Sequence, residues 1–170
     1  MPKLDRQRLI FGCYLLILIT AVELVVGHFK LPAWPAFLAM IFFFVEHMDI
    51  KKARHIVVGG TFGIGLLLLA KPIIGALAPA MGLELARLTF ILGLVFAIVA
   101  FGESLPMLFN NYAFMSLTVA GVAAQAPAPN PILWMAMSAI GGAVLIAGVV
   151  AIGKIMQAQA SAKQPAASIA

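Results

Sequence analysis

The stretch Glu46-His47-Met48-Asp49-Ile50-Lys51-Lys52-Ala53-Arg54-His55 decides the fold of this chain. It is a dense run of charge within a sequence that is otherwise apolar almost from end to end. The sequence turns apolar at once on both sides, with Phe42-Phe43-Phe44 before the stretch and Ile56-Val57-Val58 after it. Charged residues between two apolar runs are typical of a water-exposed connection between membrane helices. We therefore predict a loop over residues 46–55 and derive the topology outward from it.

The composition indicates a lipid environment for most of the chain. Of its 170 residues, 64% are hydrophobic and 10% are charged, and the mean hydropathy is +1.10. A soluble domain is roughly 45–50% apolar and about 25% charged, so this chain has too few charges to cover a soluble globule. We predict an all-α, polytopic membrane helix bundle, with residues 1–156 as one transmembrane domain and residues 157–170 as a disordered tail.

Proline and glycine clusters divide the apolar sequence into about six predicted transmembrane helices. The segment Trp34–Val45 is short for a span, which needs about 17 residues or more. The pair Lys71-Pro72 is expected to end the third span, and residues 75–82 are expected to form a turn. Four spans, with residues 103–112 re-entrant, remain an alternative. The six predicted spans are residues 9–27, Trp34–Val45, residues 56–74, Leu83–Phe101, residues 107–124 and residues 132–155.

The basic residues predict the orientation of the bundle. The net charge is +5, but Lys and Arg lie beside apolar runs, which favours a topological role over nucleic-acid binding. With both termini in the cytoplasm and six spans, eight basic residues lie inside and three outside. The inside set is Lys3, Arg6, Arg8, Lys51, Lys52, Arg54, Lys154 and Lys163, and the outside set is Lys30, Lys71 and Arg87.

Two sequence features recur in the two halves of the chain. Leu31-Pro32 precedes an aromatic-rich segment, as Leu105-Pro106 does, and each segment is followed by a glycine pair, Gly59-Gly60 or Gly141-Gly142. Two halves of three spans each would run in opposite senses across the membrane. Such 3+3 inverted repeats are found in transporters, with the pathway at the interface between halves. The alternative is that these short motifs recur by chance in an apolar chain.

The glycines also predict close helix packing. Gly59 and Gly63 are four residues apart and therefore share one helix face, which lets a neighbouring backbone approach closely. Gly141 and Gly142 lie in the last span, followed by a second small-residue face at Ala143-x-x-x-Ala147-x-x-x-Ala151. We expect these faces to pack helices together within the chain and between copies in a homo-oligomer.

The chain resembles a known bacterial family. The resemblance lies in Trp34-Pro35-Ala36-Phe37-Leu38-Ala39, the basic loop, the glycine-rich third span and the final helix with its glycine pair. These features are similar to the YcdZ-like bacterial inner-membrane family, domain of unknown function 1097, over most of residues 31–156. The charged loop departs from the more glycine-rich loop of the family. The resemblance implies a multi-pass inner-membrane protein, and it carries over no function and no site residues.

The candidate functional residues follow a proline break. Asn110, Asn111 and Tyr112 come after Pro106, and Glu103 lies close by. Broken helices expose backbone groups that can line a cavity, and polar side chains at membrane depth face either a neighbouring helix or a water-filled path. We expect a small-solute channel or transporter with these four residues on its pathway. The alternatives are that they bond neighbouring helices, and that the chain is an accessory or scaffolding membrane protein without a pathway.

Other function classes are disfavoured. The chain has no HExxH motif, and its acidic residues are predicted at opposite membrane faces, so we expect no enzyme and no catalytic residue. Glu46, His47, Asp49 and His55 are interleaved with Lys and Arg, which disfavours a metal ion. We therefore expect no cofactor and no nucleic-acid partner. The expected partners are the lipid bilayer, further copies of the chain and a small solute.

Overall fold

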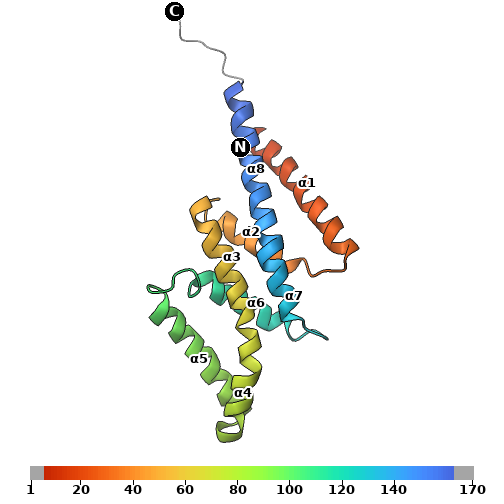
Figure 1. Cartoon of the computed structure of the whole chain (residues 1–170). Helices are drawn as coiled ribbons and strands as arrows, with labels where there is room; N and C mark the ends of the chain where they lie inside the picture. The colour runs from red at the N-terminus through yellow and green to blue at the C-terminus, as the bar shows by residue number, and fades with distance from the viewer. Residues whose placement is uncertain (1–5, 163–170) are drawn as a thin grey trace, which may run out of the picture.

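The computed structural model describes residues 6–162, and all of their regular secondary structure is helical, as predicted (Figure 1). No strand occurs within this range. Several connections are short, and Gly82 is the only residue between the helices on either side of it. The elements are α1 (Arg6–His28), α2 (Trp34–Val45), α3 (Ile50–Gly65), α4 (Leu67–Met81), α5 (Leu83–Phe101), α6 (Asn111–Ala123), α7 (Pro131–Ala136), the π-helical turn η1 (Met137–Gly141) and α8 (Gly142–Ala162).

Four helical stretches of the described chain are long and apolar enough to cross a membrane. They are Arg6–His28, Ile50–Met81, Leu83–Phe101 and Pro131–Gln159. The other two apolar helices, α2 and α6, have 12 and 13 residues. At 1.5 Å per residue they are about 18 and 20 Å long, which is less than the roughly 30 Å of a hydrocarbon core. The six-span count and its four-span alternative both stay predictions.

The charged connection is shorter than predicted. Only residues 46–49 join α2 to α3, because Asp49 caps the N-terminus of α3 and the following basic residues are already helical. The Asp49 Oδ1 atom accepts a hydrogen bond of 2.9 Å from the backbone N–H of Lys51. His47 and Met48 have φ angles of 53° and 61°, in the left-handed region that non-glycine residues seldom occupy. The predicted loop is thus a tight turn followed by the first turns of a helix.

The predicted end of the third span at Lys71-Pro72 is wrong. Helix α4 continues to Met81 with Pro72 and Pro79 inside it. In lipid, the alternative to a helix is a set of unpaired backbone groups, so a proline that removes one hydrogen bond is tolerated. The stretch ends instead at Gly82, whose φ of 82° and ψ of 158° break the helical path.

Two further boundaries differ from the prediction. Helix α6 begins at Asn111 rather than near residue 107, because the side chain of Asn110 caps it. The last helix continues to Ala162, so residues 157–162 of the expected tail are helical, and residues 163–170 lie outside the described residues. The helix is not uniform, since the π-helical turn η1 separates α7 from α8.

The two halves of the chain pack reciprocally. Each half, α1–α4 and α5–α8, contains a long helix, a short helix and a long interrupted stretch. The short helix of each half contacts the interrupted stretch of the other: α2 contacts η1 and α8, and α6 contacts α3. The long first helices do the same, since α1 contacts α8 and α5 contacts α4, and the two helices of each pair diverge from one end (Figure 1). An inverted repeat would require this pattern, although the repeat itself stays a prediction.

The predicted packing glycines lie where these contacts are tightest. A Cβ atom added to Gly63 would lie 2.8 Å from Ala113 Cα in α6. A Cβ atom on Gly141 or Gly142 would lie 2.8 Å from the Cβ of Ala36 or Ala39 in α2. Both short helices therefore approach a glycine of the opposite half, at a distance that a side chain would prevent.

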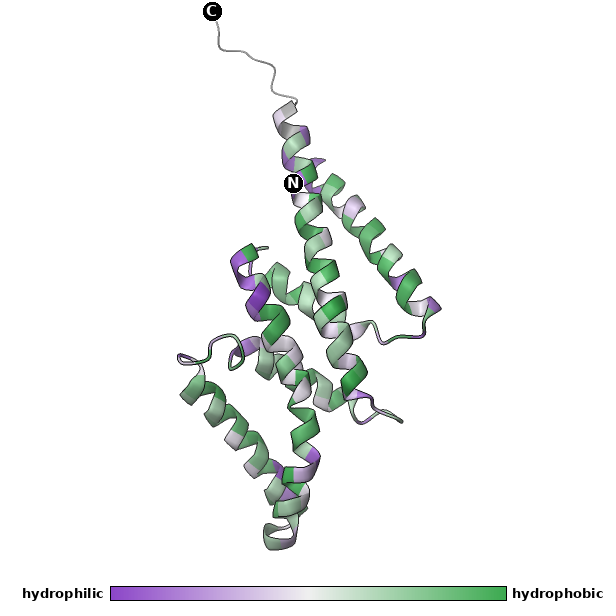
Figure 2. Cartoon of the chain, viewed as in Figure 1, coloured by the Kyte–Doolittle hydropathy of each residue, from purple (hydrophilic) through white to green (hydrophobic). Residues whose placement is uncertain are grey.

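The outer helices present apolar side chains to their surroundings. Within the described chain, α1 buries only Val26, α5 buries only Ala86, and α4 buries no residue. Figure 2 shows apolar residues along these helices and a concentration of hydrophilic residues at the start of α3. Exposed leucine, isoleucine and phenylalanine over whole helices are the surface that lipid solvates.

Candidate functional site

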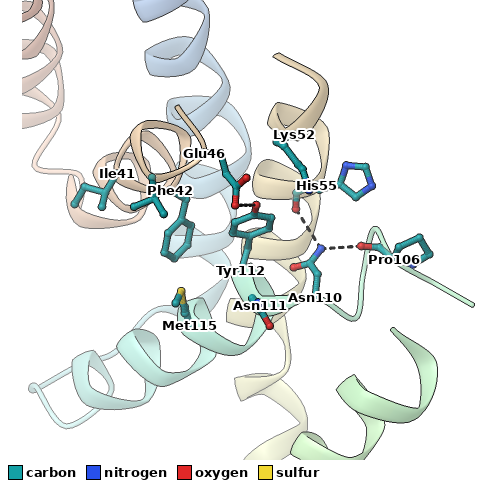
Figure 3. A pocket seen from close by; sticks show the side chains of 11 residues that line it. Ile41, Phe42, Glu46, Lys52, His55, Pro106, Asn110, Asn111, Tyr112 and Met115 are labelled. Carbon is teal, nitrogen blue, oxygen red and sulfur yellow. Dashed lines mark hydrogen bonds between the residues drawn. The ribbon is translucent and has the colours of Figure 1, made fainter. Parts of the chain in front are cut away.

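A pocket opens where the charged turn meets the start of α6 (Figure 3). Its volume is about 660 Å³, within the range of roughly 300–1,000 Å³ that small-molecule sites occupy. It lies at the seam between the two halves, because one wall comes from α2 and α3 and the other from α6 and the loop before it. The lining residues are Ile41, Phe42, Val45, Glu46, Lys52, His55, Pro106, Asn110, Asn111, Tyr112 and Met115.

A hydrogen bond joins the two halves across this pocket. The Tyr112 hydroxyl donates to Glu46 Oε1 at 2.6 Å, and the Tyr112 ring lies 5.5 Å from that of Phe42, centroid to centroid. Tyr112 is one of the predicted pathway residues, and its partner Glu46 is not. The two residues are 66 positions apart, and no local pattern links them.

Asn110 lines the pocket, but its polar atoms are occupied by the protein. Its Oδ1 atom accepts from the N–H of Ala113 at 3.0 Å. Its Nδ2 atom donates to the backbone oxygens of Pro106, Met107 and His55, at 3.0, 3.2 and 3.4 Å. A Cβ atom on Gly59 would lie 2.8 Å from Asn110 Cγ, so Gly59 leaves the space that the amide fills. This asparagine begins α6 and ties the loop to α3.

Free polar groups come from four other lining residues, one of which is His55, whose Nδ1 atom is buried without a partner in the described part of the chain. Asn111 and Lys52 are exposed, and neither side chain has a hydrogen-bond or ion-pair partner within residues 6–162. Glu46 keeps one carboxylate oxygen beyond the one that Tyr112 binds. The His55 ring points toward Pro106 and away from Glu46 (Figure 3). A solute in the pocket would therefore meet an ammonium group, a carboxylate oxygen and an amide.

Glu103 is not part of this pocket. It is exposed in the loop between α5 and α6, and it does not contribute to the lining. The structure thus brings Asn110, Asn111 and Tyr112 together and leaves the fourth predicted pathway residue apart.

The opposite end of the same helices is closed by aromatic packing. Trp34 and Trp134 lie 5.4 Å apart, centroid to centroid, edge to face. Trp134 packs with Ile64 of α3 and Ala120 of α6 in a buried cluster. Because Trp34 begins α2 and Glu46 follows its last residue, the tryptophan pair and the pocket lie at opposite ends of that helix.

Two buried serines lie between these ends, and they are the polar groups that sequence analysis left unassigned. Ser116 of α6 and Ser138 of η1 are each 2% exposed. Single serines are common in apolar helices, so neither stands out by itself. The spacing of Ser116 from Tyr112, one helical turn, is the signal that could have placed it below the pocket.

Comparison with known proteins gives a family. No curated protein and no solved structure matches the chain significantly. A family profile matches residues 13–154, which contain the pocket, both buried serines and the tryptophan pair. The expected resemblance to domain of unknown function 1097 is confirmed by this match. The chain belongs to the family described as Protein of unknown function (DUF1097).

Proposed function

We propose that this protein is a small-solute channel or transporter whose pathway runs along the seam between its two halves. The observation that carries the proposal is the pocket of about 660 Å³ at that seam, which contains the unpaired groups of Asn111 and Lys52. A pocket with free polar groups between apolar helices is a favourable place for a polar solute to enter a membrane protein.

The arrangement of the halves supports the same function. We infer that the halves form an inverted repeat, because each short helix packs on the interrupted stretch of the other half. Transporters built in this way bind their solute at the repeat interface, next to broken helices. The junction at Leu66 between α3 and α4 and the π-helical turn before α8 are local irregularities in two otherwise continuous helical stretches, and they lie at the corresponding place in each half.

The pathway is open at one end and closed at the other. The pocket lies beside the basic start of α3, which the basic residues place on the cytoplasmic side. The contact between Trp34 and Trp134 closes the opposite end. We therefore propose that the structure represents a cytoplasm-facing state.

Flux through liposomes tests the proposal. Purified protein, reconstituted into liposomes, should raise the permeability to at least one small polar solute above that of protein-free liposomes. Asn111→Leu should lower this flux, because it replaces a free amide of the pocket with an apolar side chain. Gln125→Leu makes the same amide-to-leucine change in an exposed turn outside the pocket, and should leave flux unchanged. A broad solute panel without flux would count against a pathway.

Location and assembly belong to the same proposal. We place the protein in the bacterial inner membrane with both termini in the cytoplasm, and we propose that copies associate through α8. Ala143, Ala147 and Ala151 support this association, because all three are exposed on the surface of the single chain. Ala147→Cys, in a Cys13→Ala background, should form a disulfide-linked dimer when native membranes are treated with a thiol oxidant. Reporter fusions that place residues 51–54 in the periplasm would contradict the orientation.

A second candidate is an accessory or scaffolding membrane protein without a pathway. It is favoured by the small number of residues that α1, α4 and α5 bury inside the chain, which leaves long apolar faces for a partner. This candidate predicts that a second protein remains bound during purification in mild detergent, and that liposomes show no flux. Flux that Asn111→Leu reduces would exclude it.

A further inference from the structure

The two buried serines come from different segments of the second half and meet at one glycine of the first. The position of a Cβ atom on Gly60 lies 3.2 Å from Ser116 Oγ and 3.6 Å from Ser138 Oγ. Both hydroxyls therefore border the same small region beside the Gly60 backbone. Because Gly60 has no side chain, no atom of that residue stands between the α3 backbone and the two hydroxyls.

Neither hydroxyl has a partner. Within residues 6–162, Ser116 and Ser138 form no side-chain hydrogen bond, and each is 2% exposed. The Thr61 Oγ1 atom, on the residue next to Gly60, is fully buried and also has no partner in this range. Buried polar groups are nearly always paired, and an unpaired one costs free energy unless water or a ligand supplies the missing bond. Ser138 lies inside η1, and π-helical turns are frequent at functional sites. Two unpaired hydroxyls at one point therefore indicate a position that a polar molecule occupies.

This point lies on the line between the pocket and the tryptophan cluster. On α3, Gly60 lies between His55, which lines the pocket, and Ile64, which packs with Trp134. On α6, Ser116 lies between Asn111 at the pocket and Ala120 at the cluster. Four residues separate Tyr112 from Ser116, a rise of about 6 Å. A solute that passed the Glu46–Tyr112 pair would reach the serines next.

The buried residues next to the serines in the described part of the chain are apolar. The neighbouring buried residues on the three segments are Ile56, Ala113 and Met137. An ion at this depth would lose its hydration shell and gain only two neutral hydroxyls, which is strongly unfavourable. An uncharged solute gives up only a few hydrogen bonds to water, and the two hydroxyls can replace them because each both donates and accepts.

We propose that Ser116, Ser138 and Gly60 form a selectivity point for a small uncharged solute that hydrogen-bonds through hydroxyl or amide groups. The charged groups of Glu46 and Lys52 line the entrance of the pathway, and the neutral serines select which solutes pass beyond it. This inference rests on the proposed transport function and names its solute class.

Solutes of one shape and different charge test the inference. Urea, guanidinium and nitrate are planar and similar in size, and glycerol adds an uncharged polyol. Protein-containing liposomes should take up urea or glycerol faster than protein-free liposomes, with guanidinium and nitrate uptake unchanged by the protein. Ser116→Ala and Ser138→Ala should each lower the uncharged flux about fivefold, as expected for the loss of one hydrogen bond. Gly60→Ala should lower it further, because the new methyl group would lie 3.2 Å from Ser116 Oγ.

Matched variants separate these effects from damage to the fold. Ser104→Ala removes an exposed hydroxyl, and Gly121→Ala adds a methyl group with no atom within 4 Å, so both should retain full flux. If Gly60→Ala does not fold, the serine variants carry the test. Guanidinium or nitrate flux equal to urea flux would overturn the inference and leave the transport function in place, as would undiminished urea and glycerol flux in both serine variants. No protein-dependent flux of any solute, in this set or a broader one, would overturn both.

Discussion

Replacing Gly63 by alanine tests the contact between the two halves most directly. A Cβ atom at Gly63 would lie 2.8 Å from Ala113 Cα and 2.7 Å from Ala113 C, both backbone atoms of α6. The distance to C is about 0.7 Å below the 3.4 Å at which ordinary contact begins, and the Ala113 carbonyl oxygen is nearer still. A helix backbone cannot move aside as a flexible side chain can, so α3 and α6 must separate over their length.

The size of the effect follows from two opposing terms. Overpacking of this kind costs about 1–3 kcal/mol. The change from glycine to alanine inside a helix stabilises the folded chain by about 0.5–1 kcal/mol. Gly93→Ala in α5 provides the second term alone, because nothing lies within 4 Å of its added Cβ atom. The two variants should therefore differ by about 1–3 kcal/mol in stability, which corresponds to a Tm difference on the order of 5 °C for a chain of this length.

Thermal unfolding in mild detergent measures this difference. The chain has two tryptophans, and both lie in the contact between α2 and α7, so their fluorescence reports on that contact. Gly63→Ala should unfold at a lower temperature than both the parent protein and Gly93→Ala. An unfolding temperature for Gly63→Ala equal to that of Gly93→Ala would show that α6 does not lie on α3 as described.

The same assay checks three further changes. Tyr112→Phe should lower stability by about 1.5–3 kcal/mol, because it removes the 2.6 Å hydrogen bond to the Glu46 carboxylate; unchanged unfolding would mean that the bond does not hold the halves together. Asn110→Ala should cost at least about 0.5–2 kcal/mol through the lost helix cap, whereas Asn110→Asp, which keeps the capping oxygen, should cost less. Met48→Gly should raise the unfolding temperature, because glycine adopts its φ of 61° without strain, and a lower temperature would contradict the turn geometry.

The apolar runs in the sequence predicted where the helices lie. Leu83–Phe101 and Trp34–Val45 are helices with the predicted bounds. Gly82 and Gly102 flank the first, whereas Pro32 precedes the second and the charged turn after Val45 ends it. An ion pair at the start of α5 has the same local origin, because Glu84 and Arg87 are three residues apart, and Arg87 Nη1 lies 3.2 Å from Glu84 Oε1. These features are local, so they follow from neighbouring residues.

The structure differs from the sequence-based predictions where the lipid environment or a tertiary contact outweighs a local sequence preference. Pro72 is a breaker in water, but it remains inside α4 because backbone groups in lipid have no other partner than the helix. Asn110 has the residue type of a solute ligand, yet it caps a helix and contacts the backbone of His55, 55 residues away. Its role depends on a tertiary contact. The position of Ser138 beside Gly60 has the same origin, and no spacing in the sequence encodes it.

The single residue between α4 and α5 has a consequence for how copies of this protein relate to one another. Only Gly82 connects the halves covalently, and the main apolar cluster draws its buried residues from both of them. Neither half completes that cluster alone, so the complementary half is required but need not come from the same polypeptide. Straightening of the chain at Gly82 would allow two polypeptides to exchange halves while keeping every interhelical contact, the geometry of a domain-swapped dimer.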